Sequence, residues 1–234
     1  MNIKKILLSA VCIVAVAGIS VMGTLAYLTD STAVVNTFTM GNVDIKLDET
    51  IVDVNGDPVD ENGNPTQEPV RAEKGNEYKL IPGKEYTKDP MITVVKGSEE
   101  SYVRMLVTMN CQKAINEIFD PQLQAETRLD AFFKGYDSSK WLYKGETTDT
   151  TADTITYEFR YHTTVSAPDA DVALEPLFTT FVAPDFLTGE DLKKLDDFKI
   201  TVVGHAIQAE GFADADAAWA AFVEPTNNNT PTNP

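Results

Sequence analysis

The sequence predicts a mainly β protein, an antiparallel β-sandwich that carries short helical insertions. Two observations lead to this prediction. Seven or more segments alternate apolar and polar residues or are rich in β-branched residues, and turn-forming residues separate them. The helical patterns between these segments are short. A chain of 234 residues with this pattern corresponds to one sizeable domain.

Residues 1–26 have the pattern of an export signal peptide. Lys4 and Lys5 form a basic start, and a long uncharged, largely apolar stretch follows them. Small residues near Ala26 form the kind of pattern that signal peptidases cut, which predicts cleavage between Ala26 and Tyr27. The alternative is that the stretch stays uncleaved and anchors the chain, because about 20 apolar residues span a bilayer.

The net charge limits which binding partners are expected, and the cysteine content limits which disulfides can form. The net charge of the chain is −17, and removal of Lys4 and Lys5 with the signal peptide makes it −19. Nucleic acid and anionic lipid are therefore excluded as expected partners of the mature protein. Cys12 lies in the signal peptide, so Cys111 is left without an internal disulfide partner. We expect Cys111 to be a buried, inert thiol, with a nucleophilic role as the weaker alternative.

Residues 27–47 form the first strand segment. From Thr37 to Leu47 apolar side chains alternate with polar ones, which predicts a long half-buried strand, and a change of phase at Gly41-Asn42 indicates a bulge or kink in it. The apolar set is Phe38, Met40, Val43, Ile45 and Leu47.

Residues 48–223 are predicted to form the sandwich, and residues 224–234 a disordered tail. The expected strands lie at 91–95, 102–109, 141–143, 154–162, 177–182 and 198–209, and Asn55-Gly56 marks a turn. Helical insertions are expected near 113–136 and 188–196, with a C-terminal helix at 214–223. Thr188 and Asp191 have the spacing of a capping box, and Asp214 is placed to cap the last helix.

Several segments together resemble the TasA/camelysin family of exported Firmicute proteins. These segments are GTLAYLTDS at 23–31, NTFTMGNVDIKL at 36–47, PGKEYTKDPMITV at 82–94, SYVRMLV at 101–107 and VVGHAIQAEGF at 202–212. The resemblance implies a jelly-roll-like β-sandwich, cleavage by a SipW-type signal peptidase, and a structural role in the biofilm matrix or at the cell surface of a Gram-positive bacterium.

The resemblance also implies self-assembly into a homopolymer, or assembly with a related matrix protein. In TasA-like proteins the segment after the cleavage site is a donor strand that inserts into the next subunit. Here residues 27–47 would be that strand, with Phe38, Met40, Val43, Ile45 and Leu47 buried in the neighbour. The alternative is that the segment folds back into its own domain and exchanges only on assembly.

Catalytic chemistry has little support in the sequence. Camelysin-like members are described as metallopeptidases, but His162 and His205 are the two histidines and no H-E-x-x-H motif is present. We therefore expect no enzyme, no catalytic residue and no cofactor, with a camelysin-like zinc metallopeptidase as the alternative. We expect His162 to face solvent and His205 to be hydrogen-bonded in a strand.

Two binding functions remain as weaker alternatives. A surface calcium site would use Asp53, Asn55, Asp57, Asp60 and Glu61, although Pro58 and Asn64 depart from the EF-hand pattern. A monomeric adhesin or carbohydrate-binding sandwich would use Tyr86, Trp141 and Tyr143 as exposed stacking platforms, although core packing is the more usual role for Trp141.

Overall fold

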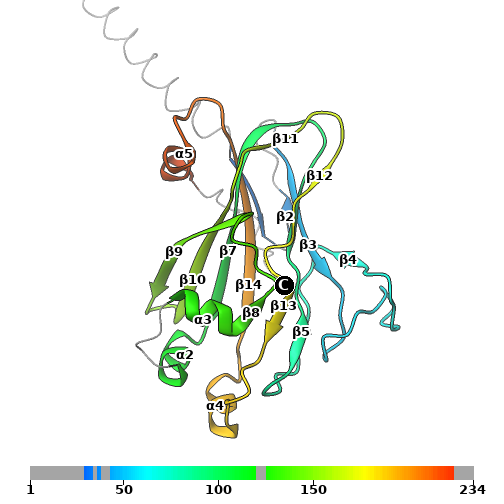
Figure 1. Ribbon diagram of the computed structural model, residues 1–234, viewed down its shortest axis with the longest axis vertical. Helices are drawn as coiled ribbons and strands as arrows, with labels where there is room; N and C mark the ends of the chain where they lie inside the picture. Colours follow the sequence, from blue (N-terminus) through cyan, green and yellow to red (C-terminus); the bar gives the residue numbers. More distant parts are fainter. Residues whose placement is uncertain (1–28, 34–35, 38–42, 120–124, 224–234) are drawn as a thin grey trace, which may run out of the picture.

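The structure is a computed structural model that describes residues 29–33, 36–37, 43–119 and 125–223. Within these ranges the chain forms fourteen strands and four short helices, arranged in antiparallel sheets (Figure 1). The predicted mainly β sandwich class is confirmed. The cleavage site at Ala26 and Tyr27, the side chains of Phe38 and Met40, and the predicted tail from 224 onward lie outside the described residues.

The largest sheet has seven strands in the order β2-β1-β14-β7-β10-β9, with β11 beside β7. The bounds are Thr29–Ala33 for β1, Asn36–Thr37 for β2, Ser98–Asn110 for β7, Trp141–Asp149 for β9, Thr154–Tyr161 for β10, Val165–Ala167 for β11 and Ile200–Gln208 for β14. Alternate residues of β7 from Val103 to Met109 are at most 1% exposed, because this face of the strand lies on the core.

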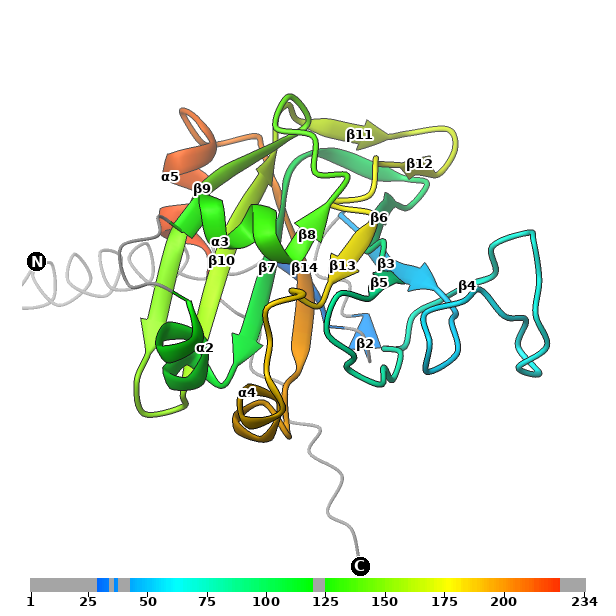
Figure 2. The ribbon, with the colours of Figure 1, turned by 60° about the horizontal axis from the view of Figure 1, so that its bottom comes forward.

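Two smaller sheets complete the domain. One has the order β12-β6-β3-β4 and the other β5-β13-β8. The bounds are Ile45–Thr50 for β3, Arg71–Ala72 for β4, Glu85–Thr87 for β5, Met91–Val94 for β6, Phe133–Lys134 for β8, Val172–Ala173 for β12 and Thr180–Val182 for β13. Figure 2 shows β3 and β6 to one side of β14.

The sheets approach most closely at Gly204 of β14. A Cβ atom added to Gly204 would lie 2.9 Å from Cδ1 of Ile92 and 3.6 Å from Cδ1 of Ile45, and both isoleucines are fully buried. Glycine is therefore required for β14 to lie this close to β3 and β6. This contact seals the core between the largest sheet and the four-stranded sheet.

Four short helices decorate the sandwich. They are α2 (Gln112–Ile118), α3 (Ala125–Phe132), α4 (Gly189–Lys194) and α5 (Ala215–Ala221). The predicted capping box of α4 is present. The Thr188 hydroxyl accepts a hydrogen bond from the amide of Asp191, and the Asp191 carboxylate accepts one from the amide of Thr188. The predicted cap of α5 is present too, since the Asp214 carboxylate accepts a hydrogen bond from the amide of Ala217 (2.8 Å).

The predicted strand from Thr37 to Leu47 is not one strand. β2 ends at Thr37 in the largest sheet, whereas β3 begins at Ile45 in the four-stranded sheet, so the chain passes from one sheet to the other between them. Gly41 and Asn42, where the bulge or kink is predicted, lie outside the described residues. The physical reason is that Val43, Ile45 and Leu47 bury their side chains in the core between the sheets, where they are 0–1% exposed.

Candidate functional site at the edge of β14

The N-terminal strand β1 lies at one edge of β14. The two strands pair antiparallel, from Thr29 opposite Ile207 to Ala33 opposite Val203. Beyond β1 the described part of the sheet adds the two residues of β2. β1 therefore connects to the body of the largest sheet through a single strand pair of five residues.

β14 extends further than β1 does. Its pairing with β7 runs from Ile200 to Gln208, but its pairing with β1 stops at Val203. Among the strands that the structure describes, residues 200–202 have no neighbour on the β1 side. Unpaired backbone amides and carbonyls at a sheet edge can accept an added strand.

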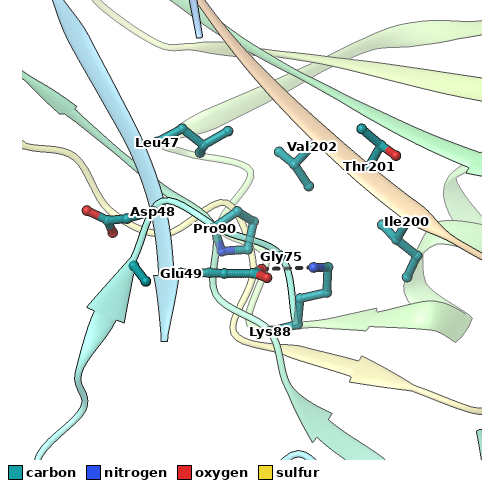
Figure 3. A pocket seen from close by; sticks show the side chains of 10 residues that line it. Leu47, Asp48, Glu49, Gly75, Lys88, Pro90, Ile200, Thr201 and Val202 are labelled. Atoms are coloured by element: carbon teal, nitrogen blue, oxygen red, sulfur yellow. Dashed lines mark hydrogen bonds and ion pairs between the residues drawn. The ribbon is translucent and has the colours of Figure 1, made fainter. Parts of the chain in front are cut away.

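A cavity of about 230 Å³ lies beside this open stretch (Figure 3). Ile200 and Val202 from β14 line one side, and Leu47 and Glu49 from β3 line the other. Lys88 lies at the base of the cavity and forms an ion pair with Glu49. A second hollow of about 780 Å³ shares Gly75, Lys88 and Ile200 with the first and continues toward α4.

The two hollows together form one groove, and charged side chains are buried at its floor. Nζ of Lys88 donates to Oε2 of Glu49 (2.8 Å), and both residues are 6% exposed. The side-chain amide of Asn76 donates to the other oxygen of Glu49 (3.0 Å). Nearby, the guanidinium of Arg71 bridges the carboxylates of Asp48 and Asp89, at 2.5 and 2.6 Å. No sequence motif marked these residues, because their partners come from distant parts of the chain.

The predicted assembly residues divide into two sets. Phe38 and Met40 lie outside the described residues, while Val43, Ile45 and Leu47 are part of the core of their own domain. The structure thus does not bring the five side chains together on one described strand.

The predicted calcium residues lie in two consecutive tight turns. The Asp53 carboxylate accepts hydrogen bonds from the amides of Asn55 and Asp57, at 2.8 and 3.0 Å. The Asp60 carboxylate repeats the arrangement with Asn62 and Asn64, at 2.9 and 2.8 Å. Hydrogen bonds from Asp57 and from Asn64, respectively, are the main reason that the pKa values of Asp53 and Asp60 are lowered. The amides of each turn are thus hydrogen-bonded to the carboxylate of its first aspartate.

The two turns have similar sequences, and the sequence patterns considered above do not identify this repeat. Residues 53–58 read DVNGDP and residues 60–65 read DENGNP, seven positions later. In both copies the glycine, Gly56 or Gly63, has a positive φ of about 80° and its amide donates to the carbonyl of the first aspartate. The spacing D-x-N-G-x-P would have identified both turns.

The two histidines are far from alike. His205 is fully buried in β14, and Nε of Arg104 donates to its Nδ1 (3.1 Å), as expected of a hydrogen-bonded structural residue. His162 follows β10 and is exposed, also as expected. Within the described ranges, no three or more His, Cys, Asp or Glu side chains are grouped so that they could hold a metal ion. The two histidines therefore do not fit a zinc centre. Glu61 and the other acidic residues of the two turns do not form such a group either.

Cys111 is half-buried rather than fully buried, and its backbone has a φ of 58° at the start of α2. Burial, followed by the nearby carboxylates of Asp153 and Asp197, raises the pKa of its thiol. A raised pKa keeps the thiolate rare, which suits the predicted inert role.

The predicted carbohydrate platform is wrong in two of its three residues. Tyr86 and Trp141 are 0% exposed, because Tyr86 packs edge-on against Tyr78 and Trp141 against Tyr161. The indole of Trp141 donates to the carbonyl of Glu175 (2.9 Å), so its polar end is satisfied inside the core. Tyr143 is half-buried.

No helix in the described ranges is long and apolar enough to cross a bilayer. No curated protein and no solved structure matches the chain. The model of a family described as camelysin metallo-endopeptidase matches residues 2–61, which include β1, β2, β3 and the first of the two turns. This match covers the N-terminal quarter of the chain and agrees there with the predicted resemblance to the TasA/camelysin family.

Proposed function

We propose that this protein is a secreted structural component of the extracellular matrix or cell surface, and that it assembles into fibres by exchanging its N-terminal strand. The observation that carries the proposal is the position of β1. It begins two residues after Tyr27, the predicted mature N-terminus, and within the described ranges it joins the body of the largest sheet along β14 alone. The extracellular or cell-surface location of the TasA/camelysin family supports the export step.

Strand exchange preserves the bonds that hold β1. A β1 strand from a second subunit can make the same backbone hydrogen bonds to β14 that the subunit's own β1 makes. The exchange is therefore nearly neutral in hydrogen bonding, and protein concentration decides which strand occupies the site. Because each subunit donates at one place and accepts at another, the contact does not close and filaments grow.

The core sets a limit to the segment that exchanges. Val43, Ile45 and Leu47 are 0–1% exposed within their own domain, and removal of such side chains costs about 2–5 kcal/mol each. We therefore place the exchanging segment before Val43. Residues 200–202 of β14, which have no partner on this side among the described strands, and the adjoining cavity are the place where a longer donor would extend its pairing.

A designed disulfide distinguishes exchange from folding back. Ala33 and Val203 are directly opposed in the β1–β14 pair. Opposed antiparallel residues have Cα separations of about 4.5–5.5 Å, which suits a disulfide. In a Cys111→Ala background without residues 1–26, we expect Ala33→Cys with Val203→Cys to give covalent ladders on a non-reducing gel after assembly.

The controls define the opposite result. At high dilution the same variant should give a disulfide within one chain and no ladder. Each single cysteine variant should give at most dimers. If the concentrated, assembled double variant remains wholly monomeric with its thiols oxidised, β1 stays in its own domain and the proposal fails.

A truncation provides an independent test. Removal of residues 27–33 takes away β1 but leaves the core strand β3 intact. We expect this variant to remain folded and to form no fibres by electron microscopy, whereas removal of the last residues, 225–234, leaves fibre formation unchanged. A SipW-type peptidase as the processing enzyme, and a related matrix protein as anchor, are part of the same proposal.

The family description favours one second candidate, a metallo-endopeptidase. Its test is zinc content together with casein cleavage that a chelator abolishes. The double variant His162→Ala, His205→Ala should then lose both zinc and cleavage. Undiminished cleavage by this variant would remove the histidines from the mechanism.

A further inference from the structure

The groove floor contains the three side chains that an internal amide cross-link requires. Lys88 is the one buried lysine and Glu49 the one buried carboxylate in the described ranges. Glu49 lies in β3, Lys88 directly follows β5, and Asn76 lies in the connection between β4 and β5. A buried ion pair loses its hydration, so this arrangement carries a free-energy cost.

We propose that Lys88 and Asn76 form an intramolecular isopeptide bond, with Glu49 transferring the proton. Nζ of Lys88 is bonded to one oxygen of the Glu49 carboxylate (2.8 Å) and Nδ2 of Asn76 to the other (3.0 Å). One carboxylate thus contacts both the nucleophile and the leaving group, which is the position of a general acid–base catalyst. The proposal is independent of fibre assembly.

The orientation of the Asn76 amide suits the reaction. Its Nδ2 donates to Glu49 and to the carbonyl of Thr50 (2.8 Å), while its Oδ1 accepts a hydrogen bond from the amide of Val52 (3.0 Å). These donors and acceptors fix which end of the amide is nitrogen. The Val52 amide also stabilises the negative charge that develops on Oδ1 when Cγ is attacked.

The steps balance without an oxidant or a further reactant. Glu49 takes a proton from the Lys88 ammonium, and the neutral amine attacks Cγ of Asn76, forming an Nζ–Cγ bond. The Cγ–Nδ2 bond breaks as Glu49 returns this proton to Nδ2, which gives ammonia. Nζ, which keeps one hydrogen in the new amide, loses its other proton through Glu49 to the ammonia. The nitrogen of Asn76 leaves as ammonium, and Glu49 is again a carboxylate.

Aromatic side chains pack on one side of the reacting atoms. The Tyr78 ring lies 5.7 Å from Nζ of Lys88 and packs edge-on against the ring of Tyr86, which is fully buried. The product would join the segment before β5 covalently to the residue that follows it.

Peptide mass spectrometry of the purified protein tests the proposal. Trypsin does not cut after a modified lysine, so the cross-link joins residues 75–79 to an uncut peptide of residues 85–96, with the loss of one ammonia. We expect this branched peptide from the wild-type chain and its absence from Lys88→Arg, Asn76→Ala and Glu49→Gln. Lys79→Arg, at an exposed lysine between the two partners, should retain it.

Intact mass alone does not decide the question. The dipeptides Asn55-Gly56 and Asn62-Gly63 can also lose ammonia by forming succinimides, and this loss would persist in Lys88→Arg. The proposal is overturned if the folded wild-type protein, after prolonged incubation at neutral pH, gives the Asn76 and Lys88 peptides only in separate, unlinked form. This readout holds even where a variant at the buried pair fails to fold, because it is made on the wild-type chain.

Discussion

At the scale of single residues, His205 makes stability depend on pH. Its ring is fully buried, and burial, followed by the charge of Arg104, lowers its pKa to about 3. As the pH falls through 6.5, the His205 ring therefore takes up a proton in the unfolded chain but stays neutral in the folded chain. The contribution of His205 is full above pH 6.5 and is lost progressively as the pH falls toward 3.

We expect the free energy of unfolding to be about 2 kcal/mol lower at pH 5 than at pH 7 because of this residue. Denaturant titrations at the two pH values measure the difference. The variant His205→Gln, whose amide oxygen can still accept from Arg104, should lose most of it. His162→Gln, at an exposed position, is the matched control and should retain it. An unchanged difference in His205→Gln would show that other groups cause it.

At the scale of elements, the two consecutive turns allow the cost of a left-handed backbone to be compared with and without a steric contact. Gly56 and Gly63 have nearly the same φ, +80° and +83°. A Cβ on Gly56 would lie 2.8 Å from the Cα of Tyr86, whereas a Cβ on Gly63 would meet nothing within 4 Å. The two positions therefore share the cost of a left-handed backbone and differ in the steric contact.

We expect Gly63→Ala to cost about 1–2 kcal/mol from the backbone conformation alone. Gly56→Ala should cost a further 1–3 kcal/mol or so, because Tyr86 is fully buried and the contact is with backbone. The free energy of unfolding of both variants provides the comparison. Equal costs would mean that the first turn moves away from Tyr86 freely.

Long alternating strands were predictable from sequence because one face of each is buried. Val103, Met105, Val107 and Met109 are 0–1% exposed, as their spacing indicated. The predicted strand 177–182 was too long, since β13 begins only at Thr180. Phe178 instead stacks on Phe133, with ring centroids 4.2 Å apart, so an apolar run that looked like a strand is partly a side-chain cluster.

The groove could not be predicted, because its partners are distant in sequence. Glu49 and Lys88 are 39 residues apart, and nothing in the sequence around either residue indicates that the two form a buried pair. A lone glutamate and lysine in polar stretches are usually exposed, and their burial becomes visible only when β3 and the end of β5 are placed together. Helix caps such as Thr188 and Asp214 were predictable, since their bonding partners lie within three residues.

At the scale of the whole molecule, charge opposes the proposed assembly. Subunits without residues 1–26 carry a net charge of −19, and every approach of two copies works against their repulsion. Salt screens this repulsion, because the Debye length falls from about 10 Å at 0.1 M to about 3 Å at 1 M ionic strength. Mild acid acts in the same direction by protonating carboxylates.

We therefore expect fibre growth to speed up with salt and with mild acid, as measured by light scattering and electron microscopy at fixed protein concentration. The truncation of residues 27–33 separates assembly from simple precipitation, since it changes the net charge by one unit only, through Asp30. If this variant aggregates as fast as the longer chain at high salt, screening promotes nonspecific association. If only the longer chain responds, charge controls how often subunits meet, and β1 determines whether the encounter becomes a fibre.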